Sequence, residues 1–142
     1  MRHIALLSLL LLAACRQSEA PKIQVSDAWA RAATAVNAPA AAYLTISNDG
    51  GDDRLISIES DRGTGASLHL TRMSNGMMEM RPLPEGLAVP GHGDVRLEPN
   101  GTHVMLDNAG PLAAGDQFNL VLKFEMSAPV NVPVTVVAPG SR

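Results

Sequence analysis

Short stretches in which apolar and polar residues alternate recur along most of this sequence, and they constrain its fold more than any other feature. Seven stretches of this kind are rich in Val, Ile and Leu: residues 43–47, 55–58, 66–70, 95–98, 103–106, 118–126 and 130–136. Because successive side chains of a strand point to opposite faces, a period of two predicts strands that are buried on one face. Turn signals rich in Gly, Asn, Asp and Pro lie between them. We therefore expect an all-β protein, an antiparallel β-sandwich in which loops at the two ends carry the function.

The first fourteen residues have the layout of a secretory signal. Arg2 supplies a positive charge, and an apolar run follows from Ile4 to Ala14, too short to span a bilayer as a helix. The run ends in Leu-Ala-Ala before Cys15, which resembles the lipobox of bacterial lipoproteins and predicts lipidation of Cys15. The predicted parts are a signal peptide at 1–14, the lipidated Cys15 with a polar tether at 15–22, one folded domain at 23–138 and a tail at 139–142.

This N-terminus predicts a periplasmic protein anchored to a membrane through its lipid. Arg16 follows the lipidated residue, where an Asp is associated with retention in the inner membrane. The outer membrane is therefore the favoured location.

Composition excludes several classes of function. Cys15 is the only cysteine, so an internal disulfide is impossible, and lipidation removes its thiol from any chemistry. The formal net charge is −3 and aromatic residues make up 3% of the chain, so the basic stripe and stacking residues of a nucleic-acid binder are missing. We expect a monomer that binds no nucleic acid.

Histidine and methionine gather in the middle of the sequence. Four of the seven methionines are close together, and one histidine precedes them while a His-x-Met pair follows: His69, Met73, Met77, Met78, Met80, His103 and Met105. Exposed methionines are wasteful unless they serve a purpose, so this clustering is the most informative feature for function.

Strand periodicity predicts which of these side chains share a face. His103 and Met105 alternate with Val104, so they point the same way. The Pro99-Asn-Gly turn just before them is a hairpin signal, which predicts that the pair lies near the tip of a hairpin. Sequence periodicity therefore places this His-x-Met pair at one end of the sandwich.

His69 lies between two leucines that we expect in the core, so its side chain should face outward. We expect residues 71–79 to form a Met-rich loop around Asn75-Gly76, and a hairpin there would return Met80 to the side of His69.

The donor types indicate the metal. Thioethers are soft and uncharged and favour Cu(I), and imidazole also binds copper. Zinc sites normally use Cys, His and carboxylates. Two Met with one or two His would thus form a soft, low-charge site suited to Cu(I). Met73, Met77, Met78 and His92 are candidates for a secondary metal site or a docking surface, and Trp29, Arg31 and Tyr43 are assigned a structural role.

The spacing His69-x10-Met80-x22-His103-x-Met105 resembles the ligand motif of the periplasmic PCu(A)C copper-chaperone family, with one extra residue in the second gap. Further segments resemble the family over residues 25–137: 27–31, 41–48, 78–82, 97–106 and 120–125. The resemblance implies a cupredoxin-like sandwich with Greek-key connections that binds Cu(I) through these four side chains. It also implies delivery of copper for assembly of cytochrome oxidase, either to an oxidase subunit or to a thiol-based copper chaperone. The His/Met-rich C-terminal tail of some relatives is absent here.

Other functions remain to be weighed against copper delivery. A blue-copper electron carrier needs a Cys ligand, and no Cys follows position 15. A copper oxygenase that binds metal through its terminal amine conflicts with acylation of Cys15. Hydrolase motifs such as Gly-x-Ser-x-Gly are missing, so we do not expect an enzyme. A lipoprotein that buffers copper or zinc, or a sandwich that binds a partner without metal, remains an alternative.

Overall fold

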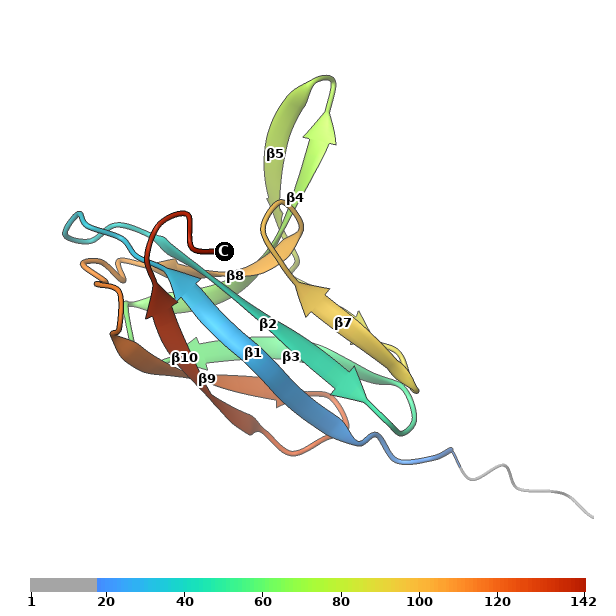
Figure 1. The fold of residues 1–142 in the computed structure, drawn as a ribbon. Coiled ribbons are helices and arrows are strands. Elements are labelled where there is room, and N and C mark those ends of the chain that lie inside the picture. The colour runs from blue at the N-terminus through green and yellow to red at the C-terminus, as the bar shows by residue number, and fades with distance from the viewer. Residues whose placement is uncertain (1–17) are drawn as a thin grey trace, which may run out of the picture.

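A computed structural model describes residues 18–142, so the predicted signal peptide and Cys15 lie outside the described residues. The described part consists of strands, turns and loops (Figure 1). The strands are β1 (Ile23–Arg31), β2 (Ala40–Asn48), β3 (Asp53–Ser60), β4 (Gly65–Ser74), β5 (Met77–Pro82), β6 (Leu87–Val89), β7 (Gly93–Leu97), β8 (Thr102–Asp107), β9 (Gln117–Phe124) and β10 (Val130–Val137). The predicted all-β class is confirmed. Nowhere in residues 18–142 is there a helix of the length and apolar character needed to cross a membrane.

The strands follow one hydrogen-bonded order, β5-β4-β8-β2-β1-β10-β9-β3-β6, and β7 also pairs with β2. This sheet curls until β3 contacts β4, which makes the two layers of a sandwich (Figure 1). The pairs are antiparallel apart from β1 with β10, which is parallel. The expected sandwich is therefore confirmed, with one parallel pair that alternation alone did not reveal.

The core follows the predicted alternation most clearly in β9 and β10. Every second side chain is buried: Phe118, Leu120, Leu122, Phe124, Val132, Val134 and Val136. Each such side chain stabilises the fold by about 1.5–3 kcal/mol when fully buried. The polar residues between them face solvent. The period of two therefore arises because one face of the sheet is buried and the other is solvated.

Strand β1 was not predicted, because its alternation is broken. The register with β2 shifts between Ser26 and Trp29, and Asp27 has a φ of 51°. A bulge of this kind inserts an extra residue and reverses the face of every side chain after it. The short strand β6 was missed as well, whereas β5 is the return strand of the hairpin that was expected to bring Met80 beside His69.

The segment 71–79 is not the Met-rich loop that we expected. Most of it extends β4 and β5, which are joined by a tight turn at Asn75-Gly76 with φ angles of 51° and 79°. Two consecutive positive φ angles match a type I′ turn, whose twist suits a two-residue hairpin. The resulting hairpin projects from the body of the sandwich (Figure 1).

The hairpin predicted before His103 is also wrong. Strands β7 and β8 run in the same direction and pair with successive parts of β2, residues 44–48 and 40–42. The turn between them closes through a Glu98 N–H bond to the Thr102 carbonyl, 2.9 Å long. The chain therefore does not fold back as a hairpin after this turn. Instead, β8 continues along β2, the strand with which β7 also pairs.

Candidate metal centre

The pairing of β4 with β8 brings together residues that are 34 or more positions apart in the sequence. His69 pairs with His103, and Ser67 pairs with Met105. Directly opposed residues of an antiparallel pair have their side chains on the same face. His69, His103 and Met105 therefore share one face, and the two imidazole centroids are 6.0 Å apart.

The β4–β5 hairpin adds the fourth predicted donor to this face. Met80 pairs with Thr71, and His69 pairs with Pro82. Since Thr71 and His69 are two positions apart in one strand, Met80 lies on the same face as His69, diagonally across the ladder. Met80, His103 and Met105 together line one pocket. All four predicted ligands are thus brought to one place on the sheet.

Exposure increases across the four side chains from one side of the site to the other. His103 is 4% exposed, whereas the Met80 side chain is 52% exposed. His69 and Met105 are half-buried. The site therefore has a buried histidine side and an open methionine side.

A hydrogen bond orients the ring of His103. Its Nδ1 donates to the Gly101 carbonyl over 3.1 Å, and the same carbonyl accepts the Thr71 N–H over 3.0 Å. With the proton on Nδ1, the Nε2 atom keeps its lone pair. This is the arrangement by which metal-binding histidines are commonly held.

In His69 the other ring nitrogen, Nε2, has the hydrogen-bond partner. Its Nε2 is 3.0 Å from Ser67 Oγ, while its Nδ1 is buried with no hydrogen-bond partner in the described part of the chain. A buried polar atom without a partner is costly, and a metal ion would satisfy it. Burial lowers the pKa of His69, and the neighbouring His103 lowers it further. The ring is therefore held neutral, which is the form that binds metal.

Two pocket residues were assigned only a structural role. Tyr43 and Arg31 line the pocket with Met80, His103 and Met105. The Tyr43 ring lies 6.4 Å from that of His103, and the Arg31 guanidinium lies 5.7 Å from the Tyr43 ring centre. Burial raises the pKa of Tyr43. The signals that could have found them are the pairings of β1 with β2 and of β2 with β8, which alternation within a single strand does not reveal.

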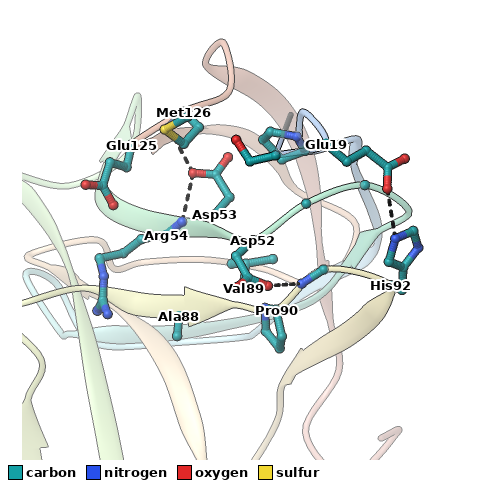
Figure 2. Close-up of a pocket in the computed structure, with 15 residues that line it drawn as sticks. Glu19, Asp52, Asp53, Arg54, Ala88, Val89, Pro90, His92, Glu125 and Met126 are labelled. Atoms are coloured by element: carbon teal, nitrogen blue, oxygen red, sulfur yellow. Dashed lines mark hydrogen bonds and ion pairs between the residues drawn. The ribbon is translucent and has the colours of Figure 1, made fainter. Parts of the chain in front are cut away.

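The other candidate residues separate into two groups. Met73 and Met78 pair across the β4–β5 hairpin, and Met77 pairs with Ser74. His92 lies elsewhere, in a second pocket where its Nε2 is 3.0 Å from Glu19 Oε2 (Figure 2). The structure therefore keeps His92 apart from the methionines.

No group of three or more His, Cys, Asp or Glu side chains with metal-site geometry occurs within residues 18–142. A metal at the site described above would rely on two imidazoles and two thioethers. That set is soft and uncharged, and it suits Cu(I).

Comparison with known sequences gives a family match and a relative. The family described as "Putative lipoprotein LpqE-like" matches residues 23–136. The protein "Putative lipoprotein Lxx21020" of Leifsonia xyli subsp. xyli is 32% identical over 120 residues, which cover 82% of this chain and 71% of that protein.

Two solved structures with a similar fold are described in copper-bound forms. The copper-bound PCuAC domain of PmoF2 matches with a TM-score of 0.67 at 24% identity, covering 83% of this chain and 94% of that domain. The Cu(I) form of DR1885 from Deinococcus radiodurans matches with a TM-score of 0.62 at 31% identity, covering 78% of this chain and 74% of that chain. The cupredoxin-like sandwich expected from the sequence is thereby confirmed.

Proposed function

The chain belongs to the LpqE-like lipoprotein family and shares the fold of PCuAC domains, and from this premise we propose that it is a copper chaperone. It binds one Cu(I) through His69, Met80, His103 and Met105 and delivers it to another protein. The observation that carries this proposal is the strand register, which gathers the four donors on one face. DR1885, described in its Cu(I) form, is 31% identical to this chain.

The donor set favours Cu(I) for two physical reasons. Thioethers are soft ligands that do not titrate, so they bind a soft monovalent cation without adding charge. The two imidazoles contribute lone pairs at the His103 Nε2 and the unpartnered His69 Nδ1. A thioether site also persists in an oxidising compartment, where thiols would be lost to disulfides.

The gradient of exposure supports delivery. His103 binds the ion from the buried side of the site. The half-exposed Met80 is on the open side, so it is the donor that a partner's ligand reaches first. Displacement of Met80 by a partner thiolate would open a stepwise exchange in which the copper is never free. The partner we propose is a cytochrome oxidase subunit or a thiol-based copper chaperone involved in oxidase assembly. Binding and transfer break no covalent bond, so the role is not enzymatic.

The place of action that we propose is the periplasm, with a lipid anchor at Cys15. The Leu-Ala-Ala-Cys sequence and the match to a lipoprotein family support the anchor. Arg16 favours the outer membrane.

A Cu(I) competition titration tests the binding site. We would use residues 16–142, which contain all ten strands and lack the thiol of Cys15, under reducing conditions with a chromophoric chelator. The wild type should hold one tight equivalent, and Met80→Leu/Met105→Leu should lose it, because Leu keeps the volume but removes the sulfur. Met77→Leu/Met126→Leu is the matched control, since both methionines are exposed and neither lines the site. Equal loss in both variants, or loss in neither, would overturn the assignment.

A second measurement separates delivery from buffering. The copper-loaded protein is mixed with a thiol-based Cu(I) acceptor, and transfer is followed over time. Delivery predicts exchange much faster than spontaneous dissociation into chelator at matched affinity. Exchange no faster than dissociation would indicate buffering.

A further inference from the structure

The outer end of the β4–β5 hairpin carries methionines that the four-ligand site does not use. Met73 and Met78 are 63% and 56% exposed. They are directly opposed across the ladder, two positions beyond the pair Thr71 and Met80 and on the same face. Large exposed apolar side chains are unfavourable without a function, and here two of them are placed face to face.

We infer that Met73 and Met78 form a second, weaker Cu(I) site at the outer end of the hairpin, through which copper enters and leaves the four-ligand centre. The inference concerns the route to that centre, so its role in transfer rests on the proposed function. The existence of the second site does not, because it depends on Met73 and Met78 alone.

The geometry of the ladder permits both thioethers to bind one ion. Opposed residues of an antiparallel pair have Cβ atoms about 4.5–5.5 Å apart. Methionine has three rotatable side-chain bonds, so both sulfurs can turn toward a common point above the pair. Since the hairpin forms through a two-residue turn at Asn75-Gly76, this opposition is fixed by the backbone.

The same ladder connects the second site to the first. Met78 and Met80 are two positions apart in β5, so they lie on one face and about 7 Å apart along the strand. Both side chains line the pocket that also contains His103 and Met105. Met80 can therefore serve either site, and copper can pass from the opposed pair to the histidines without leaving the row of sulfurs.

The donor types predict the order of filling. The outer pair offers two thioethers and no imidazole, and it is more exposed than His103 and Met105. Its affinity should be lower than that of the centre, so it should fill only after the first equivalent. A site of this kind suits exchange, because an ion held by two exposed thioethers is released readily.

Met77 provides a matched control. It is adjacent to Met78 and 67% exposed, but it pairs with Ser74 and faces the opposite side of the hairpin. Substitution by Leu keeps the apolar surface and removes only the sulfur, so it distinguishes metal binding from hydrophobic docking.

The experiment titrates residues 16–142, with 13C-labelled methionine methyl groups, with Cu(I) under anaerobic conditions. The first equivalent should shift Met80 and Met105. The second should shift Met73 and Met78, and it should be lost in Met73→Leu/Met78→Leu but retained in Met77→Leu. Retention of the first equivalent in each variant shows that the fold and the main site survive.

Two outcomes would overturn the second site while leaving the main site standing. One is saturation at a single equivalent, with the Met73 and Met78 methyl groups unmoved. The other is a second equivalent that persists in Met73→Leu/Met78→Leu, which would place it elsewhere. Failure of the first equivalent to shift Met80 and Met105 would instead count against the proposed function.

Discussion

The two histidines of the proposed copper site are held by different neighbours. His103 is held through its Nδ1 by a backbone carbonyl, whereas His69 is held through its Nε2 by the hydroxyl of Ser67. The Gly101 carbonyl belongs to the main chain just before β8, so a side-chain substitution cannot remove it. The hydroxyl is a side chain, and its contribution can be measured.

We expect Ser67→Ala to lower the Cu(I) affinity of the main site by about tenfold, since loss of a partner that orients a metal-binding histidine typically costs 10–100-fold. The half-buried Ser67 contributes little to the core, so the midpoint of thermal unfolding should change little. Chelator competition measures the affinity, and Ser57→Ala in β3 is the control. Unchanged affinity in Ser67→Ala would show that the hydroxyl does not orient His69.

At the level of elements, a single carboxylate fastens the end of β9 to the start of β3. Asp53 is 7% exposed and accepts hydrogen bonds from the backbone N–H groups of Arg54 and Met126 (Figure 2). It also accepts hydrogen bonds from the backbone N–H and the hydroxyl of Ser127. Burial by itself would raise the pKa of Asp53, but these four hydrogen bonds outweigh it and lower the pKa below its ordinary value. The charged form is therefore the one that the fold requires.

This residue gives a pH-dependent stability with a definite sign. Because its pKa is lower in the folded state, Asp53 stabilises the fold above its unfolded pKa of about 3.9 and loses that contribution as pH falls through the folded value. Asp53→Asn should cost about 2–3 kcal/mol at pH 7, since one accepting oxygen becomes a donor that faces N–H groups. Denaturant unfolding at several pH values measures both effects. The difference between wild type and variant should shrink below pH 4, and a constant difference would contradict this account.

On the scale of the whole molecule, the β4–β5 hairpin, which carries part of the proposed metal centre, and the N-terminal segment lie toward opposite ends of the sandwich (Figure 1). Ala41 of β2 lines the metal pocket, and Asn48 at the other end of β2 holds the backbone of Lys22. Seven residues of strand separate them, which is about 24 Å. An anchor at Cys15 would therefore direct the metal centre away from its membrane.

The part of the predicted tether that the structure describes is docked on the domain. The N–H groups of Asp49 and Gly51 donate to the carbonyls of Lys22 and Ala20, and Asn48 Oδ1 accepts the Lys22 N–H over 3.0 Å. A Cβ on Gly51 would lie 1.9 Å from the Glu19 carbonyl oxygen. Glycine at this position is therefore required for the close approach of the two backbones.

We expect Gly51→Ala to undock residues 19–22 without altering copper affinity, because the clash is at the end remote from the metal centre. Hydrogen exchange should show loss of protection at the amide of Lys22. Gly93→Ala is the control, since a Cβ there would be no closer than 3.7 Å to any neighbour. Retained protection in Gly51→Ala, or equal loss in both variants, would show that the docking does not depend on this approach.

Sequence alone determined the class of fold and the identity of the candidate ligands. A period of two is a local property, and it requires half-buried strands wherever they pair. The choice of His69, Met80, His103 and Met105 followed from the softness of thioethers and from a family spacing, neither of which needs coordinates.

Tertiary structure decided what depends on pairing between distant segments. The bulge at Asp27 hid β1, and the Asn100 turn joined two strands on one partner instead of forming a hairpin. The opposition of Met73 to Met78 and the hydrogen bond between Ser67 and His69 follow from register and side-chain placement. Register is set by the summed packing of the whole sheet. The side chains next to each candidate ligand are therefore known only once the pairing of all the strands is known.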